Sequence, residues 1–442
     1  MSHVGLIGEN SIEYIERLID IWNNGDCVVL IDWRIPFRTA VEMMKEADVS
    51  VCYLEDGKYE IQDSFSKIDF IRYQRKSNSA EILPIEIYDK FENNYSQNEA
   101  VVLYSSGTTG KAKGIILSHY AINTNADAII DYMKLTVNDG IYIAKVLSHS
   151  STLIGEVLVA LKSQTKLVIA PTIVPPRFVF QSISKFDVSI ICLNPTLLQK
   201  LSEEYATGKY TVPMLRTIYV SGSILNDKVY NYAHNTFNDL HIFNVYGLSE
   251  AGPRVTAQRA DCCKSNSVGK PIKGVDIKII DNTGNLLGRG ECGTVYVNTS
   301  SRFNGYIVGN EKLKSYSPDW INTGDMGYID ENEELHIVGR LDDLVIINSY
   351  KVYPCFVERI LLKHKHVDEC KVLYTEKYGL TCVYTKTTNK DIKKELLNLV
   401  NNRLAYYEIP KKFLCIKSIP KTNTGKVRTN EIKKIIDEGG KM

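Results

Sequence analysis

Helical and strand patterns alternate along the first part of this 442-residue chain, and this alternation restricts the possible folds more than any other feature. Apolar residues at helical spacing in 12–22 predict an amphipathic helix that ends before Gly25. The apolar runs 28–31 and 49–54 predict buried strands, and Pro36 between them is typical of a helix start. Strands that alternate with helices form mostly parallel sheets covered by helices. The sequence therefore predicts an α/β fold.

The rest of the chain predicts two further kinds of region. The polar, weakly periodic stretch 74–100 predicts a variable surface connection rather than core. From 269 to 297, β-rich runs separated by turn residues predict a section that closes a large domain. The stretch after Gly339 has strand and helix signals of its own. We therefore expect a large N-terminal domain of layered α/β subdomains, residues 1–339, and a small α+β C-terminal domain, residues 340–442.

Composition excludes several classes of protein. The formal net charge of +1 supplies no overall field that would hold nucleic acid or an anionic membrane. The first residues lack the layout of a signal peptide, and the apolar runs 153–161 and 167–170 are too short to span a bilayer. The ten cysteines include no Cys-x-x-Cys pair, so we expect reduced thiols rather than disulfides or a zinc site. These features favour a cytoplasmic enzyme that acts on small molecules.

A loop rich in serine, glycine and threonine follows the strand-like run 101–103. Small residues let the backbone approach an anion closely, and consecutive N–H groups can surround phosphate oxygens. Hydroxyl groups and lysines add further donors. The combination, over eleven residues, favours phosphate binding over a plain flexible turn. The loop consists of Tyr104, Ser105, Ser106, Gly107, Thr108, Thr109, Gly110, Lys111, Ala112, Lys113 and Gly114.

This loop is not a mononucleotide P-loop. That motif requires a glycine, four further residues, and then Gly-Lys followed by a hydroxyl residue. Here Ser105 stands where the first glycine belongs, and Ala112 stands where the magnesium-binding hydroxyl belongs. The two mismatches disfavour a kinase-type phosphoryl transferase.

Together with four later motifs in fixed order, the loop resembles the adenylate-forming superfamily of acyl-CoA synthetases, adenylation domains and luciferase-like enzymes. The resemblance covers nearly the whole chain. The later motifs are Asn-Val-Tyr-Gly-Leu-Ser-Glu-Ala-Gly at 244–252, Asn-Thr-Gly-Asp-Met-Gly at 322–327, the hinge-like Gly-Arg-Leu-Asp-Asp at 339–343, and Pro-Lys-Thr-Asn-Thr-Gly-Lys-Val-Arg at 420–428.

The resemblance implies that ATP activates a carboxylic acid as an acyl-adenylate, with release of pyrophosphate. The acyl group would then pass to the thiol of coenzyme A or of a phosphopantetheinyl carrier protein. Lys426 would contact the substrate carboxylate and the α-phosphate, because a fixed cation lowers the cost of bringing two anions together. The small domain is expected to be mobile and to rotate about Asp342 between the two half-reactions.

The matched motifs also supply residues for the nucleotide and its metal. Glu250 and Thr109 would hold Mg²⁺, which neutralises the triphosphate. Tyr246 would offer its ring to adenine, Asp325 would accept hydrogen bonds from the ribose, and Arg340 would reach the ribose or phosphates. Each could be structural if taken alone, and the shared motif pattern favours the functional role. The expected nucleotide-binding residues are Ser105, Ser106, Gly107, Thr108, Thr109, Gly110, Lys111, Lys113, Ser221, Gly222, Ser223, Asn244, Tyr246, Gly247, Ser249, Asp325 and Arg340.

Two positions depart from the family pattern on the side expected to receive the thiol. Ser349 replaces a glycine that commonly lines the pantetheine tunnel, and its Cβ is awkward where φ must be positive. Phe356 stands where an acidic residue is usual. These changes predict a credible adenylation step and a less efficient thioester step.

The acid is constrained only in part. By resemblance, His149 lies beside the acyl pocket. The expected catalytic residues are therefore Lys426 and Glu250, from the motifs above, together with His149. Ser151 stands where amino-acid-activating relatives usually place an aspartate for the substrate ammonium group. This favours an acid without an α-amino group and leaves aryl, short-chain and medium-chain acids open. The alternatives are a stand-alone amino-acid adenylation enzyme that loads a carrier protein, and a catalytically weak binding protein on the same fold.

Overall fold

The computed structural model describes residues 1–60, 67–106, 112–172, 174–260, 267–308, 311–314, 319–347, 350–421 and 427–438. The chain forms two compact units. No helix among the described residues is both long and apolar enough to cross a membrane. The first unit consists of Met1–Ser221, Leu225–Ile277 and Tyr296–Ile321, and the second of Gly222–Ile224, Lys278–Val295 and Asn322–Met442.

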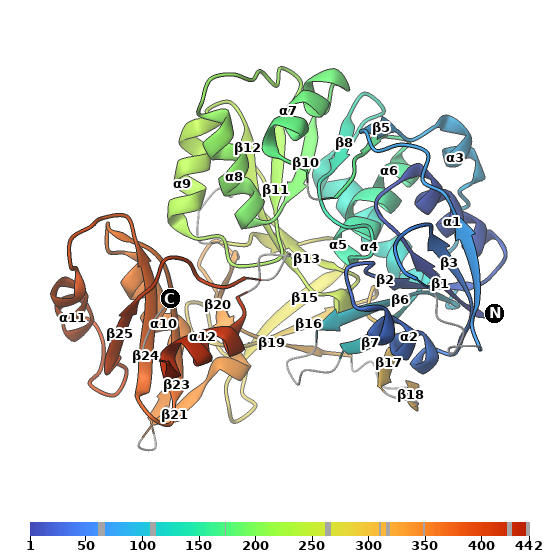
Figure 1. Cartoon of the computed structure of the whole chain (residues 1–442). Helices are drawn as coiled ribbons and strands as arrows, with labels where there is room; N and C mark the ends of the chain where they lie inside the picture. The colour runs from blue at the N-terminus through green and yellow to red at the C-terminus, as the bar shows by residue number, and fades with distance from the viewer. Residues whose placement is uncertain are drawn as a thin grey trace. The chain divides into compact units, whose positions relative to one another are not determined.

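Among the described residues, the first unit contains two eight-stranded sheets with helices packed on them (Figure 1). The first sheet has the strand order β18-β17-β7-β6-β2-β1-β3-β4. Its strands β1, β2, β3, β4 and β6 pair in parallel, and β7, β17 and β18 pair antiparallel with their neighbours. The elements of this layer are β1 (His3–Ile7), α1 (Ile12–Asn23), β2 (Cys27–Ile31), α2 (Phe37–Glu46), β3 (Val49–Glu55), β4 (Asp69–Tyr73), β6 (Glu99–Ser106), β7 (Ala112–Ser118), β17 (Gly305–Val308) and β18 (Glu311–Lys314).

Helix α1 shows how the sequence specifies this layer. Ser11 caps the helix, because its hydroxyl accepts a hydrogen bond of 3.1 Å from the N–H of Tyr14. The side chains of Ile15, Leu18 and Ile19 are fully buried, so the apolar stripe faces the core. The predicted helix and the predicted buried strands that follow it are confirmed.

The second sheet has the strand order β14-β13-β12-β11-β10-β8-β9-β5. Its central strands β12, β11, β10, β8 and β9 are parallel, and β13, β14 and β5 are antiparallel to their neighbours. Apolar residues of α7, α8 and α9 pack on this sheet in one core cluster. The elements are β5 (Glu81–Ile82), α3 (Ile85–Lys90), α4 (His119–Met133), β8 (Gly140–Ile143), α5 (Ser150–Thr152), the π-helix η2 (Leu153–Leu158), α6 (Val159–Ser163), β9 (Lys166–Ile169), α7 (Pro176–Lys185), β10 (Ile190–Leu193), α8 (Pro195–Tyr205), β11 (Thr217–Val220), α9 (Asp227–Thr236), β12 (His241–Gly247), the 3₁₀ turn η3 (Ser249–Ala251), β13 (Arg254–Ala257) and β14 (Lys270–Pro271).

The stretch 74–100 is more than the surface connection that its polar sequence predicts. It contains β5, α3 and the start of β6, and the side chains of Leu83, Ile87 and Tyr88 are buried. The hydroxyl of Tyr88 donates a hydrogen bond of 2.8 Å to the carbonyl of Thr165. Most of the stretch is exposed or half-buried, as predicted, but the sequence did not reveal these buried contacts, because they follow no regular apolar period.

The second unit contains smaller sheets and three helices among its described residues. Its core includes Val357, Leu361, Val367 and Leu396. Most of the four-stranded sheet β15-β16-β19-β20 belongs to this unit. The pair β21-β22 and the three strands β23-β24-β25 form separate sheets. The elements are β15 (Val275–Ile280), β16 (Gly293–Thr299), β19 (Ile321–Ile329), β20 (Leu335–Arg340), the 3₁₀ turn η4 (Leu341–Asp343), β21 (Val345–Ile347), β22 (Tyr350–Val352), α10 (Pro354–Leu362), β23 (Val367–Thr375), β24 (Gly379–Lys386), α11 (Lys393–Asn401), β25 (Lys412–Cys415) and α12 (Thr429–Asp437).

The division into units differs from the boundary expected at residue 339. Strands β19 and β20 pair as a hairpin, from Asp325 with Arg340 to Ile329 with Leu335. This pairing groups residues 322–339 with the C-terminal part of the chain. Compact grouping does not reveal where the chain bends, so the domain boundary and the hinge at Asp342 stay predictions.

Candidate active site

The loop predicted to bind phosphate joins two antiparallel strands, β6 and β7. Ser105 pairs in register with Lys113, and Ser106 with Ala112, so both ends of the loop are held by the ladder. The predicted loop residues between them lie outside the described residues, and their roles, including that of Thr109 as a metal ligand, stay predictions. They are Gly107, Thr108, Thr109, Gly110 and Lys111.

A chain of contacts leads from β7 to the predicted metal ligand Glu250. Nζ of Lys113 lies 5.8 Å from the centre of the Tyr306 ring. The hydroxyl of Tyr306 donates a hydrogen bond of 3.2 Å to Oε1 of Glu250. Burial, together with the negative charge of Glu250, raises the pKa of Tyr306, so this hydroxyl keeps its proton and acts as the donor.

Sequence reasoning missed Tyr306, because a single tyrosine in a strand belongs to no motif. The backbone also places Glu250, since its carbonyl accepts a hydrogen bond of 2.9 Å from the N–H of Phe303. Strand β17 and the segment before it therefore hold the predicted metal ligand beside the strand that follows the predicted phosphate loop.

The motif 244–252 occupies the end of β12, and its first residue has a structural role. Asn244 is buried, and its side-chain amide donates a hydrogen bond of 3.0 Å to the carbonyl of Ser267. The N–H of Asn244 donates to Oε1 of Gln258 at 2.7 Å. The half-buried Tyr246 follows at the same strand end. Asn244 therefore fixes the strand end that presents Tyr246, and its predicted contact with nucleotide stays a prediction.

Gly247 is required by a close approach of the chain to itself. A Cβ at this position would lie 1.8 Å from the carbonyl oxygen of Pro253. No side chain fits at that distance, which explains sterically why the motif has glycine after Tyr246. The β12–β13 connection can therefore fold back tightly and place Glu250 in η3.

The segment that carries His149 contacts the same motif. His149 is the residue before α5, and the hydroxyl of the next residue, Ser150, lies 2.8 Å from the hydroxyl of Ser249. The structure thus brings together the predicted acyl-pocket segment and the predicted nucleotide motif, which lie about a hundred residues apart in the sequence.

Asp325 and Arg340 meet on neighbouring strands of the second unit. Nη1 of Arg340 lies 3.0 Å from Oδ1 of Asp325 and donates a second hydrogen bond of 3.3 Å to the carbonyl of Thr323. Asp325 is 8% exposed. Gly324 has a φ of +69°, and a Cβ there would lie 2.9 Å from Nη2 of Arg340. The two residues expected at the ribose are thus placed side by side as an ion pair.

The short Ser-Gly-Ser turn follows β11. The N–H of Ser221 donates a hydrogen bond of 2.9 Å to the carbonyl of Leu193 at the end of β10. Gly222 and Ser223 are exposed. Their role in nucleotide binding stays a prediction.

The predicted catalytic lysine, Lys426, lies outside the described residues, as does Ser349. The residues that flank Lys426 in the sequence, Lys421 and Val427, form an isolated antiparallel bridge. Lys421 is also ion-paired with Glu369. The roles of Lys426 and Ser349 stay predictions.

Asp343, which follows the expected hinge residue Asp342, forms an ion pair with Lys371. Nζ of Lys371 lies 3.1 Å from Oδ2 of Asp343 and 3.2 Å from Oε1 of the half-buried Glu358. Phe356, which replaces the usual acid, packs its ring against Tyr353 with 5.6 Å between ring centres. Phe356 is therefore part of local aromatic packing in α10, and any effect on thiol transfer stays a prediction.

A buried charged cluster near His149 was not predicted from the sequence. Glu156 in η2 is fully buried, and its Oε1 lies 3.0 Å from Nζ of Lys145. Burial raises the pKa of Glu156, while the positive charges of Lys145 and Arg254 oppose that shift. The signal that could have revealed the cluster is one acidic residue in the middle of the apolar run 153–161.

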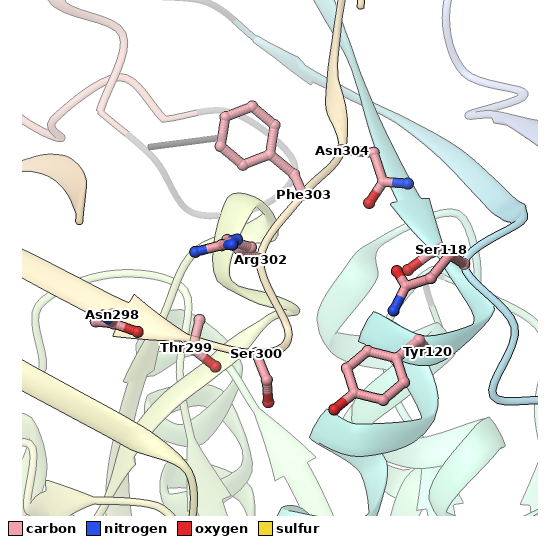
Figure 2. A pocket seen from close by; sticks show the side chains of 9 residues that line it. Ser118, Tyr120, Asn298, Thr299, Ser300, Arg302, Phe303 and Asn304 are labelled. Atoms are coloured by element: carbon pink, nitrogen blue, oxygen red, sulfur yellow. The ribbon is translucent and has the colours of Figure 1, made fainter. Parts of the chain in front are cut away.

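Two further features contain none of the residues expected from the motifs. His3, Cys27 and Glu99 place possible metal-ligand atoms within 4.8 Å of one another, with His3 Nε2 2.8 Å from Glu99. The first unit also has a pocket with a volume of about 610 Å³. Figure 2 shows side chains that line it. Its lining is largely polar and consists of Gln97, Ser118, Tyr120, Asn298, Thr299, Ser300, Arg302, Phe303 and Asn304.

Comparisons with known proteins agree with the motifs. Residues 1–307 match the family described as AMP-binding enzyme, and residues 357–426 match its C-terminal domain. Over 354 residues the chain is 28% identical to 4-coumarate–CoA ligase-like 3 of Arabidopsis thaliana, an alignment that covers 76% of this chain and 63% of that protein. Over 434 residues it is 24% identical to 2-succinylbenzoate–CoA ligase of Enterococcus faecalis, covering 96% of this chain and 86% of that protein.

The fold is also found among solved structures. The crystal structure of ATP-bound MatB from Rhodopseudomonas palustris matches with a TM-score of 0.84 at 21% identity. The match covers 100% of this chain and 90% of that protein. A likeness at this identity confirms the α/β fold with a large N-terminal and a small C-terminal part.

Proposed function

This chain belongs to the AMP-binding enzyme family, and we propose that it uses ATP to convert a carboxylic acid into an acyl-adenylate and pyrophosphate. The acyl group then passes to a thiol. The observation that carries the proposal is the position of Glu250, held by Tyr306 beside the strand that ends the Ser/Gly/Thr loop. An acidic residue next to a phosphate-binding loop is what a nucleotide–metal complex needs.

The described residues fit a magnesium ion at Glu250. The carboxylate is half-buried, and the Tyr306 hydroxyl donates to Oε1. Mg²⁺ prefers carboxylate oxygens together with substrate phosphates. When bound, Mg²⁺ neutralises charge on the triphosphate. The protein's own contribution is to fix the direction of the carboxylate through β17 and to keep the Tyr306 proton on its hydroxyl.

Asp325 and Arg340 are proposed to bind the ribose side of the nucleotide. Arg340 contacts Oδ1 of Asp325 and so orients the carboxylate, which as an ionised group can accept more than one hydrogen bond, including one from a ribose hydroxyl. Lys426 is proposed to hold the substrate carboxylate and the α-phosphate during the first half-reaction. The bond between the carboxylate oxygen and phosphorus forms as the bond to pyrophosphate breaks, and Lys426 stabilises the negative charge that develops.

We propose coenzyme A as the thiol acceptor. The two curated relatives compared above carry coenzyme A ligase in their names. A phosphopantetheinyl carrier protein presents the same terminal thiol and remains the alternative acceptor. The thiolate attacks the acyl carbon, the acyl–phosphate bond breaks, and AMP leaves. A cytoplasmic location belongs to this proposal, and cell fractionation tests it.

The test is ATP–pyrophosphate exchange with a panel of aryl, fatty and amino acids, followed by addition of coenzyme A. Exchange with an acid, and AMP release that coenzyme A accelerates, supports the whole proposal. Exchange without a coenzyme A effect supports adenylation and favours a carrier protein as acceptor. Formation of ADP overturns the proposal in favour of a kinase-type phosphoryl transferase. No exchange with any acid also overturns it and returns the weakly catalytic binding protein as the better explanation.

A further inference from the structure

The buried charged cluster joins three elements of the first unit. Lys145 follows β8, Glu156 lies in η2, and Arg254 begins β13. Glu156 is fully buried, and Arg254 is 3% exposed. Besides the ion pair of 3.0 Å between Lys145 and Glu156, the guanidinium of Arg254 lies against η2, because a Cβ built on Gly155 would be 3.3 Å from its Nη2. Two cations therefore flank one buried carboxylate.

The charges in this cluster do not balance. Lys145 and Arg254 both act on Glu156 as positive charges. The charge of Arg254 also acts on three neighbouring side chains, Tyr132, Cys192 and Tyr219. Burial raises the pKa of each of them, and the pKa of Cys192 rises to about 12, so all three are neutral. The cluster therefore carries at least one excess positive charge, whether or not Glu156 holds a proton. Isolated buried charges are costly and are normally paired.

Several polar atoms of the cluster also lack hydrogen bonds within the protein. Nη1 of Arg254, Oε2 of Glu156 and the hydroxyl of Tyr132 are buried without a hydrogen-bond partner among the residues that the structure describes. They come from β13, η2 and α4. Buried polar groups are nearly always satisfied by protein, water or ligand. Of these atoms, Nη1 of Arg254 and the Tyr132 hydroxyl can donate, so together with the excess positive charge they can receive a polar anion.

The cluster adjoins the nucleotide motif directly. Arg254 is the register partner of Gly247 across the β12–β13 pair. Nζ of Lys145 lies 3.5 Å from the hydroxyl of Ser151, and the neighbouring Ser150 is hydrogen-bonded to Ser249 at 2.8 Å. Arg254 therefore lies beside the strand end that carries the nucleotide motif, where the acid is expected to react.

We infer that the acid activated by this chain carries a second negatively charged group, which binds Arg254 and Lys145. The inference rests on the proposed function, because it names the substrate class of the same site. An ammonium group, as in an amino acid, fits the cluster poorly, since Glu156 already has two cations beside it. The two cations thus disfavour the amino-acid adenylation alternative on electrostatic grounds.

The first test uses wild-type enzyme and needs no variant. ATP–pyrophosphate exchange is measured with aliphatic and aromatic dicarboxylic acids of increasing length, each beside its monomethyl ester. The ester keeps nearly the same shape and removes only the distal charge. At the best length the diacid should have a kcat/KM roughly 10- to 100-fold above that of its ester, as a charge-assisted hydrogen bond predicts. Acids with a distal sulfonate or phosphonate identify the preferred anion.

Substitutions of Arg254 and Lys145 test whether the preference for a second anionic group arises at this cluster. Arg254→Met should reduce exchange with the diacid about 10- to 100-fold and spare the ester, whereas Arg254→Lys should keep part of the preference. Arg38→Met is the control, because Arg38 is an exposed arginine on α2. Melting curves show whether each variant is folded. If Arg254→Met does not fold, Lys145→Met provides the same comparison.

The possible failures are distinguishable. If wild-type enzyme uses monomethyl esters, or acids without a distal charge, as well as it uses diacids, the inference on substrate class is wrong and the proposed function stands. An unchanged diacid preference in folded Arg254 and Lys145 variants also overturns the inference. If no acid of any kind supports exchange, the proposed function fails as well.

Discussion

Asp325 and Arg340 face each other across the β19–β20 hairpin, with 3.0 Å between Oδ1 and Nη1. The carboxylate is 8% exposed, and Gly324 leaves room for the guanidinium beside it. Two residues from separate motifs therefore act as one unit, in which the arginine fixes the direction of the carboxylate.

We predict that Asp325→Asn weakens ATP binding. The variant loses a charged acceptor for the ribose and leaves Arg340 without its carboxylate, so kcat/KM for ATP should fall roughly 10- to 100-fold. Pyrophosphate exchange at varied ATP concentration measures this. Asp276→Asn is the control, because Asp276 is an exposed acid in β15. An unchanged KM for ATP in Asp325→Asn would contradict the assigned role.

Lys426→Ala should remove most adenylation activity and leave ATP binding nearly intact, because the loop and Tyr246 remain. Loss of one fixed cation at the transition state predicts a fall in kcat of about 100-fold or more. Exchange kinetics and equilibrium binding of ATP separate the two effects. Lys433→Ala, an exposed lysine on α12, should change neither. Equal losses in binding and turnover would argue against a transition-state role.

Ser349→Gly should increase thioester formation several-fold without changing adenylation, because glycine admits the positive φ expected at the pantetheine tunnel. The measurement compares coenzyme A-dependent AMP release with pyrophosphate exchange in the same preparation. If both rates stay unchanged, Ser349 does not limit thiol access.

Gly247→Ala should destabilise the first unit. The added Cβ would approach the Pro253 carbonyl oxygen to 1.8 Å, so β12 and β13 must move apart. We expect a loss of about 2–4 kcal/mol in the free energy of unfolding, measured by urea denaturation. Gly288→Ala is the matched control, because its Cβ would meet only the flexible end of Glu291, at 3.2 Å. Similar stability losses in both variants would show that the close approach is not responsible.

Asp139 should contribute a pH-dependent part of the stability. Burial raises its pKa, but hydrogen bonds from Arg216, Ser189 and Thr136 outweigh burial and hold the pKa at about 2, below the ordinary 3.8. The folded state therefore favours the ionised form, and the contribution is present above pH 4 and disappears as the pH falls through about 2. Asp139→Asn should lose about 2 kcal/mol in the free energy of unfolding at neutral pH. Denaturant titrations at several pH values test this, and a difference that persists near pH 2 would exclude ionisation as the cause.

The sequence alone determined the class of fold and the order of the motifs. The spacing of apolar residues predicted α1, and the apolar run predicted β2, because both patterns depend only on residues that are close in sequence. The glycine at 247 and the aspartate at 325 could be assigned to motifs for the same reason. The sequence could not show that Tyr306 donates to Glu250, since that contact joins residues 56 positions apart.

Only the tertiary structure decided which charges meet inside the protein. Lys145 follows β8, Glu156 lies in η2 and Arg254 begins β13, and no motif contains all three. The proximity of these three charges depends on how β8, η2 and β13 pack, because electrostatic energy depends on distance and burial rather than on position in the chain. The local sequence therefore specified the nucleotide-binding motifs, whereas packing of distant elements created the buried positive charge that we expect to select the acid.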